Sequence, residues 1–182
     1  MDGRAYRRHS RDGAVNGALA MTENSAPVGY MERTRLYYRA LGYSPDYVWA
    51  HFDDVPFARL SRPLAESRIA MVTTASPADR ANRDARGVRR VWSAPTTPPP
   101  ETWFTDDLAW DKVSTHMRDR ESFLPIETAT SLAAEGLFAG LTAHFHGVPT
   151  EYSHRKTTRE DVPALLGLLR DERADGVLLF PI

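Results

Sequence analysis

The sequence predicts an α/β fold in which a Rossmann-like parallel sheet is built from βαβ units. Three patterns along the chain support this prediction. A short apolar run, 68–75, follows a charged stretch and ends at a Ser-Pro pair, which is typical of a buried strand. Apolar residues over 162–169 recur at the spacing of one helical face. The pair Asp175-Gly176 then turns into a second apolar run, 176–182, which we expect to be a buried final strand.

A tail, a helix and an arm are expected before the first strand. Residues 1–30 are rich in Gly, Ser, Asn and Arg without any hydrophobic period, which indicates a disordered tail. Apolar residues from Leu36 to Ala40 recur at helical spacing, and Gly42 is placed to end that helix. The next stretch, 43–57, combines aromatic residues with prolines, so we expect an extended arm packed across the domain.

The remainder of the chain, 31–182, is expected to form one α/β domain with an insertion. Residues 76–101 contain many turn residues and three consecutive prolines, which favours a linker-like insertion. We expect Trp92 and Trp103 to anchor this insertion to the core. The elements expected after it are a strand over 110–116 with Val113 inward, a helix over 125–135 ended by Gly136, a strand over 141–148, and a helix begun by a capping box of Thr157 and Glu160. This βαβαβ succession implies parallel pairing with right-handed crossovers.

Composition and charge exclude several classes of function. The 182 residues allow one domain, and 23 basic against 24 acidic residues give a net charge of -1. That balance offers no electrostatic argument for binding nucleic acid or an anionic membrane. The chain contains no cysteine, which excludes disulfides and thiolate zinc sites. No apolar run reaches the roughly 18 residues that span a bilayer, and no signal peptide is recognised, so we expect a cytoplasmic protein.

Candidate pocket residues follow from the rule that ligands of open α/β sheets bind beyond the carboxyl ends of strands. The candidates are Thr73, Thr74, Thr115, His116, His144, His146, Pro181 and Ile182. His144 and His146 are two residues apart on an expected strand, so both side chains should point to the same face. The alternative that these are ordinary strand-end threonines and polar histidines stays open.

Other chemistry is weakly indicated. Four histidines could offer imidazole ligands to a metal, but their spacing matches no metal motif and we predict no metal; they are His116, His144, His146 and His154. His51, Asp53 and Asp54 form a possible acid–base cluster, although their aromatic surroundings favour a packing role. The chain contains no glycine-rich dinucleotide motif, no P-loop and no nucleophile-elbow motif.

Several stretches of the chain resemble one known family. They are residues 41–45, 47–57, 63–75, 110–116, 122–126, 147–153 and 175–182. In this order, over 32–182, they resemble the selenoprotein B family of glycine, sarcosine, betaine and D-proline reductases. The resemblance implies an oxidoreductase subunit that activates a small amine or amino-acid-like substrate for reductive cleavage of a carbon–nitrogen bond. It also implies a thioredoxin-like reductant and other reductase subunits as partners.

The resemblance further implies that the nucleophile is not in this chain. In the family, a selenocysteine, or a cysteine in some relatives, comes directly after the terminal pair of proline and an apolar residue. We therefore expect selenocysteine downstream of Ile182, a truncated and incomplete domain, and no catalytic residue within the chain. The alternative is a complete, non-catalytic module for ligand binding or subunit interaction. The substrate, the true start codon and the oligomeric state stay open.

Overall fold

The computed structural model describes residues 29–46, 48, 50–106, 113, 117–150 and 153–181. Residues 1–28 of the expected tail lie outside these residues. The chain divides into two compact units, 1–49 and 50–182. Within the described part, no helix is long and apolar enough to cross a membrane.

The first unit contains the helix expected from sequence. Helix α1 spans Tyr30–Ala40, and none of its residues is buried. Gly42 has a positive φ of 84°, and its amide donates a hydrogen bond to the carbonyl of Arg39 at 2.9 Å. Glycine adopts this left-handed conformation without a steric penalty, which explains why the helix ends there. The Arg39 guanidinium binds the Asp46 carboxylate at 2.8 Å.

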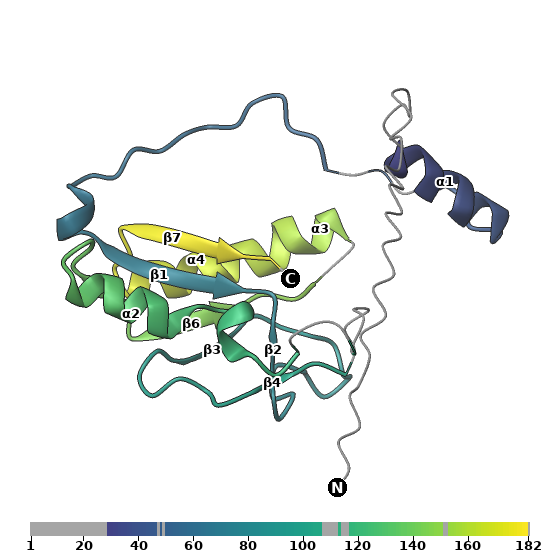
Figure 1. Cartoon of the computed structure of the whole chain (residues 1–182). Coiled ribbons are helices and arrows are strands. Elements are labelled where there is room, and N and C mark those ends of the chain that lie inside the picture. Colours follow the sequence, from purple (N-terminus) through teal and green to yellow (C-terminus); the bar gives the residue numbers. More distant parts are fainter. Residues whose placement is uncertain are drawn as a thin grey trace, which may run out of the picture. The chain divides into compact units, whose positions relative to one another are not determined.

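The second unit is built around a mostly parallel sheet (Figure 1). Its central strand, β1 (Arg68–Thr73), pairs in parallel with β7 (Gly176–Phe180). β1 also pairs in parallel with β5 (Gly140–Leu141) and β6 (His144–Gly147). The antiparallel strand β3 (Trp92–Pro95) pairs with the outer side of β6. This arrangement confirms the predicted α/β class. The sheet is mostly parallel, and the antiparallel strand β3 was not predicted.

The register shows how these strands surround β1. Ile69 pairs with both Gly176 and Leu141, and Val72 pairs with both Leu179 and His146. β5 and β6 therefore lie together on the side of β1 opposite β7. Leu141 and His146 are five positions apart, whereas their partners on β1, Ile69 and Val72, are three positions apart. The two extra residues, Thr142 and Ala143, form a bulge between β5 and β6. The strand expected over 141–148 is confirmed with this interruption.

Helices cover both faces of the sheet. Ile69 and Met71 of β1 belong to one apolar core together with residues of α2 (Ile126–Ala134). Ala70 and Val72 belong to a second core with Leu169 of α4 (Val162–Asp171). Successive side chains of a strand point to opposite faces, so the two cores lie on opposite sides of β1. The second unit thus forms three layers, with a helix on each face of the sheet.

The two crossovers have the same hand. The chain leaves β1, passes through α2 on one face and enters β6 on one side of β1. It then passes through α4 on the other face and enters β7 on the opposite side of β1. The second crossover runs in the opposite direction from the first and over the opposite face of the sheet, so the two crossovers have the same hand. A common hand is expected because nearly all such crossovers are right-handed.

The helices that come after β1 and β6 differ in how well sequence located their ends. α2 matches the expected helix, and Gly136 ends it with a φ of 84°. The expected capping box was wrong, because the second helical segment begins earlier, with α3 (His154–Lys156). The Ser153 hydroxyl caps α3 by accepting the amide of Lys156 at 3.3 Å. A π-helical turn, η3 (Thr157–Asp161), then connects α3 to α4.

The expected linker-like insertion contains regular structure. It contributes β2 (Ser76–Pro77), which pairs with β4 (Trp103–Phe104), and the edge strand β3. Trp92, Trp103 and Phe145 pack edge to face, with ring centroids 5.5 to 6.2 Å apart. These aromatic contacts attach the insertion to the core, which confirms the anchoring role expected for Trp92 and Trp103.

Two other expectations about burial were wrong. Residues 50–57, the end of the expected arm, are all exposed, so they do not pack across the unit. Val113, expected inward on a strand, lies in a turn and is 96% exposed. The neighbouring positions 107–112 and 114–116 lie outside the described residues. Short 3-10 turns, η1 (Leu64–Glu66) and η2 (Arg120–Ser122), precede β1 and α2.

The last strand is an exposed edge strand, not the buried strand that its apolar sequence predicts. Val177, Leu178 and Leu179 are 40%, 43% and 68% exposed. Among the described strands, β7 pairs with β1 alone, so its other side lacks a neighbour. An apolar run of this length reads the same whether the strand is central or at an edge, which explains the error.

Substitutions at two glycines should change the free energy of unfolding in opposite directions. A Cβ at Gly147 would overlap the indole of Trp92, so Gly147→Ala should lower the free energy of unfolding by about 1–3 kcal/mol. Gly167, inside α4, has open space around it, so Gly167→Ala should raise that free energy by about 0.5–1 kcal/mol. Urea denaturation of both variants measures the difference. A Gly147→Ala variant as stable as the wild type would contradict the contact.

Candidate functional site

The carboxyl ends of three parallel strands meet at one edge of the sheet. Thr73, the last residue of β1, is level with Gly147 of β6 on one side and with Phe180 of β7 on the other. The amide of Thr74 donates to the carbonyl of Phe180 at 3.3 Å. Three of the predicted pocket residues, Thr73, Thr74 and Pro181, are therefore brought together at this edge.

The Thr73 hydroxyl has local partners. It donates to the carbonyl of Phe123 at 3.1 Å and accepts the amide of Ala75 at 3.1 Å. The Thr73 residue is buried. These bonds fix the turn after β1 and connect it to the segment before α2, so the hydroxyl is committed to structure. Thr74 is only partly buried, so it is the more accessible of the two predicted threonines.

His146 is a buried imidazole one residue before the end of β6. It is 1% exposed and level with Val72, whose side chain faces α4. Its Nδ1 lies 2.8 Å from the hydroxyl oxygen of Ser93 on β3. Its Nε2 is buried and has no hydrogen-bond partner among the described residues. Burial is the main cause that lowers the pKa of His146, so the neutral imidazole is favoured at neutral pH.

His144 has a different environment. It begins β6, and its Nδ1 lies 2.5 Å from Oε1 of Glu172 at the end of α4. Its amide donates to Oε2 of the same carboxylate at 3.1 Å. Burial acts to raise the pKa of Glu172, but the two hydrogen bonds from His144 outweigh it and lower that pKa. His144 therefore joins β6 to α4, away from the edge where the strands end.

Three of the predicted pocket residues, Thr115, His116 and Ile182, lie outside the described residues. No three His, Asp or Glu side chains in the described part of the chain come close enough to hold a metal ion. Of the possible acid–base cluster, His51 pairs with Asp53 at 3.1 Å, and both side chains are almost fully exposed in the segment before β1. Such a solvated pair lacks the burial that tunes a catalytic group.

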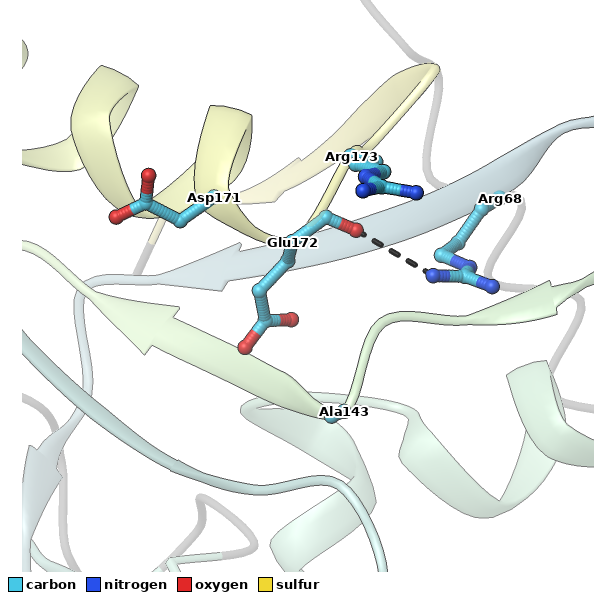
Figure 2. A pocket seen from close by; sticks show the side chains of 5 residues that line it. All are labelled: Arg68, Ala143, Asp171, Glu172 and Arg173. Atoms are coloured by element: carbon cyan, nitrogen blue, oxygen red, sulfur yellow. Dashed lines mark hydrogen bonds between the residues drawn. The ribbon is translucent and has the colours of Figure 1, made fainter.

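A charged cavity at the opposite edge of the sheet was missed by sequence reasoning. It has a volume of about 270 Å³ and lies between the start of β1 and the end of α4 (Figure 2). Its lining residues are Arg68, Ala143, Asp171, Glu172 and Arg173. The strand-end rule considers only the carboxyl edge. The one sequence signal is the charged run 170–175, which is also typical of an ordinary solvated turn.

A further cavity is lined by uncharged residues, both polar and apolar. It measures about 480 Å³ and is lined by Thr96, Thr97, Thr130, Ala133, Gly140, Leu141, Thr142 and Ala143. The hydroxyls of Thr96, Thr130 and Thr142 donate to main-chain carbonyls at 2.9, 2.8 and 2.7 Å. These bonds support the bulge between β5 and β6 and the first turns of α2.

Comparison with known proteins yields no relative: no protein-family model matches the chain, and no curated protein or solved structure matches it. The function is therefore inferred from the residues of this chain.

The Glu172–His144 contact predicts a pH dependence of stability. The pKa of Glu172 is lowered in the folded state, so its contribution is present above the unfolded value of 4.5 and is lost as the pH falls through the folded pKa. Glu172→Gln should cost about 1–3 kcal/mol at neutral pH and progressively less below pH 4.5.

Urea denaturation of the wild type and the variant across this pH range measures the effect. Asp171→Asn, which removes a neighbouring exposed carboxylate, is the matched control. A difference between wild type and Glu172→Gln that stays constant with pH would contradict the role of the ionised carboxylate.

Proposed function

We propose that this chain is the substrate-side scaffold of a reductase that cleaves a carbon–nitrogen bond, as its resemblance to the selenoprotein B family implies. The observation that supports the proposal is the meeting of three parallel strand ends at Thr73, Gly147 and Phe180. Sheets of this kind bind small ligands in the crevice beyond those ends. The proposal includes a Rossmann-like identity for the sheet.

The order of the strands supports a ligand site beside β1. The chain leaves β1 toward β6 and later returns to the other side of β1 as β7. In open α/β sheets, the crevice forms where the chain changes direction in this way. Thr74 and Pro181 come directly after the two strands that flank this position, and in the proposal they contact the substrate.

The proposal assigns proton transfer near this edge to His146. Burial favours the neutral imidazole of His146 in the resting state, and this form can accept a proton at a free ring nitrogen and then release it from the imidazolium. Its Nε2 atom has no partner among the described residues, so it has capacity for a further hydrogen bond. In reductive carbon–nitrogen cleavage, the departing amine needs a proton; in the proposal, Nε2 of His146 takes up a proton from water and passes it to the amine, which returns the imidazole to its neutral form.

The nucleophile in this proposal is a selenolate or thiolate located beyond Ile182 in the full-length product. It would attack the carbon from which nitrogen departs, and a thioredoxin-like dithiol would supply the electrons. The substrate is a small amine or an amino-acid-like compound. The described residues supply the walls of the pocket and the proton-transfer group, so this chain by itself is expected to be inactive.

The exposed edge of β7 supports the further proposal that the sheet is incomplete. Parallel strands are normally buried on both faces. β7 carries no charged residue, and Val177, Leu178 and Leu179 are all exposed. Such an edge is a template for pairing with another strand. In the proposal, a further strand of the same protein covers it.

The same edge favours a second candidate function. If no further strand of the chain covers β7, this edge is a surface for association with another subunit, and the chain is a non-catalytic interaction module. Val162 and Leu166 of α4 are also exposed apolar side chains. The two candidates differ in whether the native polypeptide continues past Ile182, so that is the property to measure.

The decisive experiment is mass spectrometry of the protein isolated from its own host after growth with selenium. The reductase proposal expects peptides that continue past Ile182 and carry selenium or a cysteine. A native product that ends at Ile182 would contradict the proposal and leave the interaction module. The tryptic peptide beginning after Arg173 reports the outcome directly, because it contains all of β7.

A further inference from the structure

Two arginines share the charged cavity at the amino edge of the sheet. Arg68 is the first residue of β1, and Arg173 lies just beyond the end of α4. Figure 2 shows both guanidinium groups on the same side of the cavity, whereas the Asp171 carboxylate points away from them. We propose that Arg68 and Arg173 bind a small oxyanion, the carboxylate or phosphate group of a small molecule.

The carboxylates nearest to these arginines have other partners. Glu172 accepts the amide and the Nδ1 contact of His144 at 3.1 and 2.5 Å. Asp175 accepts the amide of Arg68 at 2.9 Å and pairs with Nε of Arg62 at 3.3 Å. Both acidic groups are thus engaged by backbone amides and by other basic side chains, which leaves the two guanidinium groups open to a ligand.

Arg173 has an unusual backbone conformation for a charged residue. Its φ is +55°, a left-handed value that favours glycine or asparagine at the position after a helix. Its amide donates to the carbonyl of Arg170 at 3.0 Å, which completes the end of α4. Within the described part of the chain, its guanidinium makes no hydrogen bond or ion pair. A strained, charged residue where glycine would fit better indicates a role outside folding.

Arg68 also retains donor capacity. Its guanidinium has one contact, from Nη1 to the carbonyl of Glu172 at 3.5 Å, which is the limit for a hydrogen bond. A guanidinium has five N–H donors in a planar fork, and that geometry matches the paired oxygens of a carboxylate or phosphate. The cavity measures about 270 Å³, which suits a small ligand.

The helix end sets the expected strength of binding. The carbonyl end of α4 and the carboxylates of Asp171 and Glu172 line the same cavity, and they disfavour an anion. The attraction therefore depends on the two guanidinium groups together, and loss of either one should be sufficient to abolish tight binding. Because the cavity is open to solvent, added salt should weaken the interaction.

The test is isothermal titration of the full chain with inorganic phosphate and, separately, with acetate at constant ionic strength. We expect saturable binding of at least one anion. Arg68→Gln and Arg173→Gly should each weaken it by about tenfold or more. Arg170→Gln removes the same charge from an exposed position on the last turn of α4, outside the cavity, and should change the affinity by less than about twofold.

Arg173→Gly has a second, opposite readout. Glycine relieves the left-handed strain, so the variant should melt at a higher temperature while binding more weakly. A loss of binding through misfolding would lower the melting temperature instead, and Arg68→Gln then decides the question independently.

Each outcome has a defined meaning. Binding of phosphate alone indicates a phosphate-bearing ligand, and binding of acetate indicates a carboxylate ligand. The proposal is overturned if neither anion binds saturably, if Arg68→Gln leaves the affinity unchanged, or if Arg170→Gln is as harmful as Arg173→Gly. The site lies at the amino edge of the sheet, so these results do not depend on the reductase proposal.

Discussion

The burial of β1 is the constraint on which the rest of this fold depends. Residues 69–73 all pair with β7 on one side, Ile69, Val72 and Thr73 also pair with β5 or β6 on the other, and all five residues are buried. Each fully buried aliphatic side chain contributes about 1.5–3 kcal/mol by leaving water. Because alternate side chains point to opposite faces, this one strand requires a helix on each face. The positions of α2 and α4, and hence the three-layer architecture, result from it.

The two edges of the sheet have different chemistry, and β1 connects them. At its carboxyl end, Thr73 holds the next turn in place beside the ends of β6 and β7, which is where the proposed substrate crevice lies. At its amino end, Arg68 joins Arg173 in a charged cavity. His146 and His144 of β6 likewise lie near opposite edges of the sheet. The first is buried close to the carboxyl edge, and the second binds Glu172 near the other edge.

Sequence patterns located the elements whose signals lie within a few residues of the element itself. They missed the elements that depend on partners far away in the sequence. The strand at 68–73 was predictable because a short apolar run between charged and turn residues has few other solutions. α2 was predictable because Gly136 marks its end. β3 was missed because an edge strand has little apolar periodicity, and its pairing with β6 is formed across about 50 residues of chain. The charged cavity could not be predicted, since it depends on the left-handed backbone of Arg173.

Amide hydrogen exchange resolved along the chain tests this account most directly. If β1 is the buried centre of the sheet and β7 an exposed edge, the amides of 69–73 exchange only through global unfolding. In β7, the amides that point away from β1 exchange fast, in alternation with protected ones. Uniform protection throughout 176–180 would show that the β7 edge is covered. Fast exchange within 69–73 would contradict the central position of β1 and the candidate site that is built at its end.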